Sequence, residues 1–417
     1  MLRSIQVPLY LRRLEFVRLY YTVRSSSDNL SKVQNDEISK HISQRIKIAG
    51  PMTIAEYMKV VLTNPNGGYY MHRDMFGEEG DFVTSPELGQ LFGEMIAIWF
   101  LNEWSKLGSP KHLQIIELGP GRGTLCQDML RVFQHFRVLD TASVHLLEVS
   151  PLLSNLQAKR LCMTSHYDEN AVVYRKGTSH QGVPISWYRR FADIPKGFSI
   201  VIAHEFFDAL PIHKLQKTEN GYREVLVDVD PSDETKLRFI IAREETPVVK
   251  LFVNSDENRN HLEISPESVA LINLISQRIE YDGGIALIAD YGHNGESKDS
   301  FRAFKKHHLH HPLVDPGSAD LTADVDFLCL KKEALKSGGI LAYGPVSQRN
   351  FLLQMGIKYR LEKLEESCSE EQKKGLLYGF NMMTDTDKMG LRFKFLSLFP
   401  ATVEKILNKY PPIGFGE

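Results

Sequence analysis

Two acidic residues follow an apolar segment of the chain, and their spacing allows both to act on one ligand. Residues 199–203, S-I-V-I-A, predict a buried strand of a parallel sheet, and Glu205 and Asp208 come soon after it. Ligands of open α/β sheets bind at the carboxyl ends of the strands, so these acids are expected to face a crevice. Two carboxylates can hold a guanidinium by paired, charge-assisted hydrogen bonds. The alternative is that Glu205 and Asp208 only cap a turn and the neighbouring helix.

A run of alternating glycines predicts the second half of such a crevice. Residues 113–129 read L-Q-I-I-E-L-G-P-G-R-G-T-L-C-Q-D-M, an apolar strand closed by Glu117 and followed by a helical pattern. Gly119, Gly121 and Gly123 lie between the strand and the helix. Glycine accepts positive φ angles and lets a ligand lie against bare main chain. The pattern therefore predicts a nucleotide pocket, and the alternative is a structural turn without a ligand.

The spacing of the glycines indicates which class of nucleotide ligand the pocket would bind. Dinucleotide folds use G-x-G-x-x-G/A, and phosphate loops end in G-K-[ST], but this chain has an acid followed by G-x-G-x-G. That form resembles motif I of the class I S-adenosylmethionine methyltransferases. In that family the glycine turn underlies the methionine end of the cofactor, and an acid after the second strand holds both ribose hydroxyls. The residues that match, and that are expected to bind S-adenosyl-L-methionine, are Glu117, Gly119, Gly121, Gly123 and Glu148.

The elements that must position these residues follow from the hydrophobic patterns. Strands and helices alternate after the glycine turn, which predicts a doubly wound α/β sheet. Upstream, T-x-x-E at Thr53 is a capping box, and Ser85 followed by Pro86 predicts the start of another helix. The predicted fold is a class I methyltransferase (Rossmann-like) sheet with a helical N-terminal layer and a β-hairpin insertion. Residues 291–323 have little regular pattern and are expected to form a functional or disordered loop.

The first 25 residues differ from the rest, because they carry five arginines and a single acid with apolar residues interleaved. This composition is typical of a mitochondrial transit peptide, and a plain basic tail is the alternative. An alternating pattern with an Asn-Gly turn predicts the inserted hairpin. We therefore predict a transit peptide at 1–25, a helical N-terminal region at 26–110, and a methyltransferase domain at 111–417 with the insertion at about 213–264.

The composition argues against several classes of protein. The net charge of the 417 residues is −2, which gives no electrostatic reason to bind nucleic acid. The four cysteines lack a C-x-x-C pair, so neither a disulfide framework nor a zinc knuckle is predicted. No apolar run approaches the ~18 residues of a membrane span. The histidines of K-K-H-H-L-H-H lack a carboxylate or cysteine at matching spacing, so no metal site is predicted.

Several stretches in order between about residues 50 and 400 together resemble the MidA-like methyltransferases. They are G-D-F-V-T-S-P-E, E-L-G-P-G-R-G-T-L, L-L-E-V-S, H-E-F-F-D-A-L-P, A-L-I-A-D-Y-G, D-P-G-S-A-D-L-T-A-D-V-D-F and M-G-L-R-F-K. The resemblance implies a class I fold and S-adenosyl-L-methionine as cofactor. For mitochondrial members of the family it also implies methylation of an arginine on a core subunit of respiratory complex I, in support of its assembly, and hence a location in the mitochondrial matrix.

Arginine methylation gives the acidic residues a chemical role. A guanidinium has a pKa above ~12, so positioning of its nitrogen must supply much of the rate. Glu205 and Asp208 are the predicted catalytic residues. Asp290, which ends the next predicted strand, is a third candidate, and His293 is a candidate acceptor of the released proton. Trp187 is expected either to pack inside the protein or to stack on a purine.

Two other functions fit the same sequence. A non-catalytic assembly chaperone could bind a respiratory subunit and retain only a vestige of methyl transfer. A small-molecule methyltransferase would use the same cofactor pocket on a metabolite. The glycine spacing argues against a nicotinamide oxidoreductase. An oxidoreductase function would also leave the acid before the glycine turn without a role.

Overall fold

The computed structural model describes residues 37–72, 84–296 and 299–416. The predicted transit peptide lies outside these residues. None of the described helices is both long enough and apolar enough to cross a membrane. The division of the chain at residues 110 and 111 stays a proposal.

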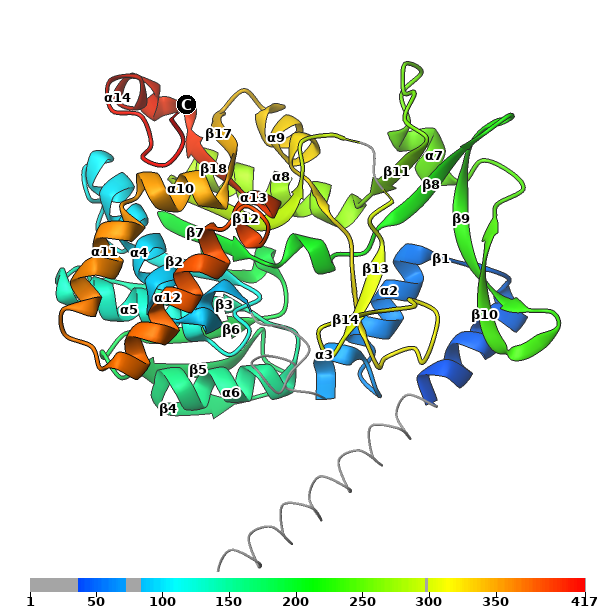
Figure 1. Ribbon diagram of the computed structural model, residues 1–417, viewed down its shortest axis with the longest axis horizontal. Helices are drawn as coiled ribbons and strands as arrows, with labels where there is room; N and C mark the ends of the chain where they lie inside the picture. Colours follow the sequence, from blue (N-terminus) through cyan, green and yellow to red (C-terminus); the bar gives the residue numbers. More distant parts are fainter. Residues whose placement is uncertain (1–36, 73–83, 297–298, 417) are drawn as a thin grey trace, which may run out of the picture.

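One large, mostly parallel sheet forms the centre of the molecule (Figure 1). Its path in space is β17 (Ile340–Ser347), β18 (Phe393–Pro400), β12 (Gly284–His293), β7 (Ser199–His204), β2 (Gln114–Leu118), β3 (Ser143–Leu147), β6 (Pro184–Tyr188), β5 (Val173–Ser179) and β4 (Cys162–Tyr167), with β16 (Val325–Asp326) beside β12. Strands β12, β7, β2, β3 and β6 run parallel, whereas β18 runs antiparallel between β12 and β17. The predicted doubly wound α/β sheet is confirmed.

Both faces of the sheet are covered because alternate residues of each strand point to opposite sides. Ile200 and Ile202 of β7 pack into one apolar cluster, and Val201 and Ala203 pack into another. Helices on the first face include α4 (Gln90–Lys106), α5 (Thr124–His135), α6 (Pro151–Leu161), α10 (Gln348–Gln354) and α11 (Ile357–Glu365). Helices α8 (Pro266–Asp282) and α9 (Phe327–Leu335) cover the second face.

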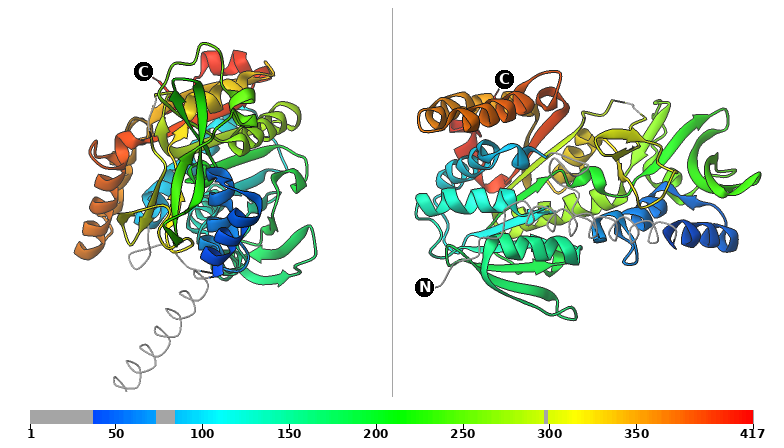
Figure 2. Two further views of the ribbon diagram at one scale, coloured as in Figure 1. Left: turned by 90° about the vertical axis from the view of Figure 1, so that its right-hand side faces the viewer. Right: turned by 60° about the horizontal axis from the view of Figure 1, so that its bottom comes forward.

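The predicted hairpin insertion is confirmed, and the structure extends it to a second sheet. Its strands are β8 (His213–Thr218), β9 (Gly221–Asp230), β10 (Asp233–Ile241), β11 (His261–Ile264) and β1 (Met52–Thr53), with α7 (Pro247–Phe252) beside them. β1 pairs with β9, so the N-terminal region is attached to the insertion. These strands and helices α11 and α12 (Glu370–Thr384) lie at opposite ends of the molecule (Figures 1 and 2).

The N-terminal layer is helical, as predicted, but one of its helices begins later than the sequence suggested. Residues 37–49 are helical, and α2 (Ile54–Thr63) begins with the predicted capping box between Thr53 and Glu56. The prediction that Ser85 caps a long helix was wrong. Residues 85–88 form a short 3-10 turn, and α4 begins only at Gln90, because Gly89 at φ +131° interrupts the helix.

The expectation of an irregular segment at 291–323 was also wrong. It contains a small antiparallel sheet of β14 (His308–His310), β13 (Arg302–Lys305) and β15 (Asp320–Thr322). These strands have three or four residues each, too few for a period-two pattern to stand out.

The remaining short elements are α3 (Tyr69–His72), η1 (Ser85–Leu88), η2 (Phe191–Asp193), η3 (Phe207–Ala209), α13 (Met389–Arg392), η4 (Ala401–Val403) and α14 (Glu404–Lys409).

Candidate active site

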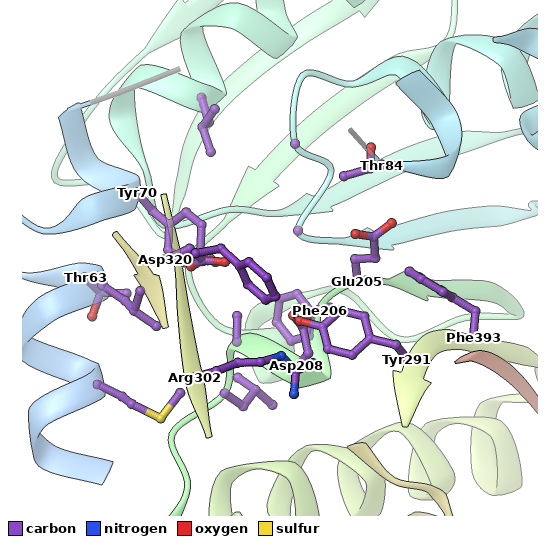
Figure 3. A pocket seen from close by; sticks show the side chains of 18 of the residues that line it. Thr63, Tyr70, Thr84, Glu205, Phe206, Asp208, Tyr291, Arg302, Asp320 and Phe393 are labelled. Carbon is purple, nitrogen blue, oxygen red and sulfur yellow. Dashed lines mark hydrogen bonds between the residues drawn. The ribbon is translucent and has the colours of Figure 1, made fainter. Parts of the chain in front are cut away.

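A cavity of about 810 Å³ opens at the carboxyl ends of the central parallel strands. Its floor comes from the turns that follow β2, β3 and β7 and from Tyr291 near the end of β12, the edge at which open α/β sheets bind ligands. Its walls come from α2, α3, the β13–β15 sheet, and the segment containing α12 and α13. Figure 3 shows side chains that line it, among them Tyr70, Glu205, Asp208 and Asp320. The predicted glycine turn and the predicted acids therefore meet at one cavity.

The three glycines adopt the left-handed backbone that their spacing predicted. Their φ angles are +62° at Gly119, +53° at Gly121 and +82° at Gly123. Gly119 and Gly121 line the cavity, and a Cβ on Gly119 would approach the Phe206 ring to 2.7 Å. Gly123 instead begins α5 and packs towards Leu161, away from the lining. Both glycines thus present main chain without a side chain at the cavity, and at Gly119 a side chain would collide with Phe206.

Glu148 lies on the cavity wall beside these glycines, although it is only 5% exposed. Its carboxylate accepts hydrogen bonds from the Ser150 N–H at 2.7 Å and from Gln157 Nε2 at 2.9 Å. Burial raises its pKa to about 7. Gln157 also donates to the carbonyl of Gly121 at 2.7 Å, so one buried amide joins the glycine turn to the acid. Gln157 could not be recognised as a site residue from the sequence, because it lies in an ordinary helical pattern.

Trp187 packs in the interior, where it holds the Gln157 side chain that joins the glycine turn to Glu148. Its side chain is fully buried and its Nε1 donates to Gln157 Oε1 at 2.8 Å. Of the two interpretations that the sequence left open, internal packing is the one seen, and Trp187 is absent from the cavity lining.

Glu117 lies beneath the glycine turn and not among the residues that line the cavity. A hydrogen bond from the backbone of Cys126 reaches its carboxyl group, and burial raises its pKa to about 8. Its second oxygen, Oε2, has no hydrogen-bond partner within the described residues. This geometry allows Glu117 to fasten the glycine turn to the start of α5.

Glu205 and Asp208 both reach the cavity from the turn after β7. Glu205 has the left-handed φ of +48°, and burial, reinforced by the charge of Asp208, raises its pKa to about 8. Asp208 accepts hydrogen bonds from the hydroxyls of Tyr291 and Thr322, while its other oxygen, Oδ1, has no partner in the described part of the chain. Burial also raises the pKa of Asp208. Asp208 therefore lies at the cavity with one buried carboxylate oxygen that lacks a partner among the described residues.

Asp290, the third acidic candidate, holds this turn from behind and is absent from the cavity lining. Its Oδ2 accepts the N–H groups of Phe206 at 3.1 Å, Phe207 at 3.0 Å and Asp208 at 3.4 Å. The side chain is fully buried, and burial with the nearby charges of Asp208 and Glu205 raises its pKa far above the usual range. Asp290 is thus a positioning residue for the acidic turn.

Removal of that support is expected to destabilise the fold. Asp290→Ala removes a buried carboxylate that accepts four backbone N–H groups, those of Phe206, Phe207, Asp208 and Tyr291, and the free energy of unfolding should fall by about 2–4 kcal/mol. Denaturant unfolding measures the change, with Asp256→Ala at an exposed position as the control. A change within about 0.5 kcal/mol of wild type would show that the turn holds without Asp290.

Two histidines near the site do not line the cavity. His204 stacks at a tilt on Phe92 with ring centroids 4.8 Å apart, and burial lowers its pKa to about 3. His293 Nδ1 accepts the Gly295 N–H at 3.1 Å. His293 therefore lacks the contact with the cavity that a direct proton acceptor needs.

Three further residues line the cavity that the sequence did not single out as site residues. Tyr70 of α3, Asp320 of β15 and Tyr291 of β12 line the cavity. Asp320 and Thr322 belong to D-P-G-S-A-D-L-T, whose acids and turn residues were the available signal. Nothing in the sequence pattern marked Tyr70.

Comparisons with known proteins agree with this geometry. A family model described as S-adenosyl-L-methionine-dependent methyltransferase matches residues 95–346. The chain is 48% identical over 409 residues to "Protein arginine methyltransferase NDUFAF7, mitochondrial" of Xenopus tropicalis, with 96% of this chain and 94% of that protein covered. It is 50% identical over 368 residues to the Homo sapiens protein of the same name, with 87% and 83% covered.

Solved structures support the fold. A COG1565 superfamily member from Burkholderia thailandensis, solved with bound S-adenosyl-homocysteine, superposes with a TM-score of 0.71 at 21% sequence identity. The match covers 88% of this chain and 93% of that chain.

Proposed function

The chain belongs to the family of S-adenosyl-L-methionine-dependent mitochondrial protein arginine methyltransferases, and on that premise we propose how its cavity works. Glu205 and Asp208 hold the arginine side chain of a protein substrate. Gly119, Gly121 and Glu148 hold the methyl donor, with Glu117 and Gly123 supporting the turn. The observation that carries this assignment is that Glu205 and Asp208 line the same cavity as Gly119, Gly121 and Glu148.

The proposed substrate is a core subunit of respiratory complex I, methylated in the mitochondrial matrix during assembly. The relatives are named as mitochondrial arginine methyltransferases, which supports the organelle and the type of side chain. The choice of complex I rests on the MidA-like motifs. The matrix rests on those motifs and on the Arg-rich first 25 residues.

The residues of the near wall fit S-adenosyl-L-methionine. Bound there, the cofactor supplies an electrophilic methyl group. Gly119 and Gly121 line the cavity, and because glycine has no side chain their main chain can lie against its methionine end. Each oxygen of Glu148 already accepts one hydrogen bond and retains a lone pair for a ribose hydroxyl. Gln157 fixes the distance between these two parts of the seat.

The acids of the turn after β7 orient the guanidinium. No ordinary side chain removes a proton from a group with a pKa above ~12, so the carboxylates act first by alignment. They accept N–H groups of the guanidinium and draw its positive charge away from the attacking nitrogen. Once that nitrogen carries a methyl group it must release a proton. Glu205 lies at the cavity with a pKa raised to about 8, which suits it to accept that proton.

The raised pKa of Glu205 predicts the pH dependence of the reaction. Below about pH 8 this carboxyl is mostly protonated and uncharged, so it neither attracts a guanidinium nor accepts a proton. We expect kcat/KM to rise up to about tenfold per pH unit and to level off above about pH 8. Rates measured from about pH 6 to about pH 9.5 test this. A flat profile in wild type, or the same rise in Glu205→Gln, would exclude Glu205 as the titrating group.

Mass spectrometry of arginine methylation tests the proposed substrate. Mitochondrial proteins are compared between cells with and without the gene, and a core subunit of complex I is expected to lose methylarginine. Complex I assembly is then measured after rescue with wild type or with Glu205→Gln/Asp208→Asn. Full rescue by the doubly substituted protein would favour the chaperone function. Labelled methyl found on a metabolite and on no protein would favour a small-molecule substrate.

A further inference from the structure

A third carboxylate faces the cavity from the wall opposite Glu205. Asp320 lies in β15, is only 5% exposed, and is one of the lining residues. The hydroxyl of Tyr70 donates to its Oδ1 at 2.6 Å. Figure 3 shows Tyr70 and Asp320 together on one side of the cavity and Glu205 on the other. Asp320 is thus held in place by a residue of the N-terminal region, far away in the sequence.

Strand geometry aims Asp320 and Asp208 at the same space. Asp320 and Thr322 are two residues apart in β15, so their side chains leave the same face of the strand, roughly 7 Å apart. The Thr322 hydroxyl donates to Asp208 Oδ2 at 2.8 Å, which attaches this face of β15 to the acidic turn. This arrangement brings Asp320 and Asp208 to the same part of the cavity, which both residues line.

The charges at this end of the cavity favour the binding of a cation. Glu205, Asp208 and Asp320 all line it. Arg302 lines it as well, but its guanidinium donates to Asp324 Oδ1 and to the Ser300 carbonyl, both at 2.7 Å. Arg392 also lines the cavity, with its guanidinium 5.6 Å from the centroid of the Tyr291 ring, so among these described residues three carboxylates face two guanidinium groups. Buried negative charge is costly until a cation neutralises it, and Asp208 Oδ1 is a buried acceptor still without a partner there.

We propose that Asp320, held by Tyr70, is a third arginine-binding carboxylate that binds the guanidinium on the edge opposite Glu205 and Asp208. A guanidinium is planar and presents five N–H donors, so carboxylates on two sides can each bind one of its edges. A lysine ammonium is a compact charge that cannot span both. Asp320 therefore determines selectivity for arginine over lysine. This inference rests on the proposed function, because it assigns the other half of the same substrate site.

Binding of small arginine and lysine analogues tests the inference without requiring methyl transfer. N-acetyl-arginine amide is titrated calorimetrically into the full-length protein saturated with S-adenosyl-homocysteine, with N-acetyl-lysine amide in parallel. Wild type is expected to bind the arginine amide and to discriminate against the lysine amide. Asp320→Asn should weaken arginine binding about tenfold or more. Tyr70→Phe should weaken it by a smaller factor, because Asp320 keeps its charge but loses its anchor.

Controls separate a binding role from a structural one. Asp326 belongs to the same segment, is the N-cap of α9, and is not among the residues that line the cavity. The Asp326→Asn variant should therefore bind the arginine amide as tightly as wild type. Asp320→Asn should keep the melting temperature and the affinity for S-adenosyl-homocysteine. In methyl-transfer assays on a protein substrate it should raise KM far more than it lowers kcat.

The outcomes distinguish this inference from the function on which it rests. Equal binding of the arginine amide by wild type and Asp320→Asn, or binding by neither, would overturn the role of Asp320. If wild type methylates protein arginine in either of those cases, the proposed function survives alone. If the arginine amide binds in an Asp320-dependent way but no protein is methylated, the role of Asp320 in arginine binding stands and the proposed reaction fails.

Discussion

Glu205→Gln combined with Asp208→Asn is expected to lower the rate of methyl transfer by about a hundredfold or more, with the affinity for S-adenosyl-L-methionine changed less than about twofold. Both substitutions keep the shape of the side chain and remove its negative charge. The guanidinium then enters a buried site that no longer compensates its charge, and its attacking nitrogen is no longer aligned. Transfer of labelled methyl to protein arginine measures the rate, and calorimetry measures donor affinity.

A matched pair of acids controls for the loss of two charges. Asp230 and Asp233 are also three residues apart, at the exposed turn between β9 and β10, and neither lines the cavity. Asp230→Asn/Asp233→Asn should methylate like wild type. Methylation by Glu205→Gln/Asp208→Asn at the rate of this control would remove the two acids from the mechanism.

Gly121→Val is expected to abolish detectable binding of the methyl donor, which corresponds to a loss of affinity of about a hundredfold or more. Gly121 has φ +53° and lines the cavity, so a branched side chain there is strained and also occupies the donor's place. Gln157 is hydrogen-bonded to the carbonyl of Gly121, so a backbone shift at this turn also disturbs the support of Glu148. Calorimetric titration with S-adenosyl-L-methionine measures the loss.

Backbone strain alone is controlled by Gly182→Val. Gly182 has φ +81° and is exposed, and a Cβ added there would meet no described atom within 4 Å. The variant should lose stability to a similar degree and keep the donor affinity of wild type. Tight donor binding by a folded Gly121→Val protein would place the donor somewhere other than the glycine turn.

The sheet could be predicted because its strands carry strong local signals. Strands buried on both faces are continuous apolar runs, such as residues 199–203, and the glycine turn marks where a helix follows. The capping box at Thr53 was visible for the same reason. The β13–β15 sheet was not, because each strand is short and gains its order from tertiary contacts. Ser85 looked like a helix cap, but the cap signal cannot show that Gly89 interrupts the helix one turn later.

From the sequence it could be predicted which acids lie near the carboxyl ends of the strands, but not which of them reach the cavity. Sequence position places Glu117, Glu205 and Asp290 near the carboxyl edge of the sheet. It does not show which way each side chain points. Glu117 lies under the turn and Asp290 binds backbone N–H groups, whereas Glu205 reaches the cavity. Tyr70 joins the site through folding of a distant segment, which no local pattern can reveal.

The part of the cavity assigned to the methyl donor and the part assigned to the protein substrate are built from different kinds of element. The donor seat is built on the turns of the central strands, where a change disturbs the whole sheet. The opposite wall is built from appended segments: α3, β15 and the stretch containing α12 and α13. Descendants of this architecture can therefore exchange the appended pieces and acquire new protein targets while inheriting an unchanged apparatus for methyl transfer.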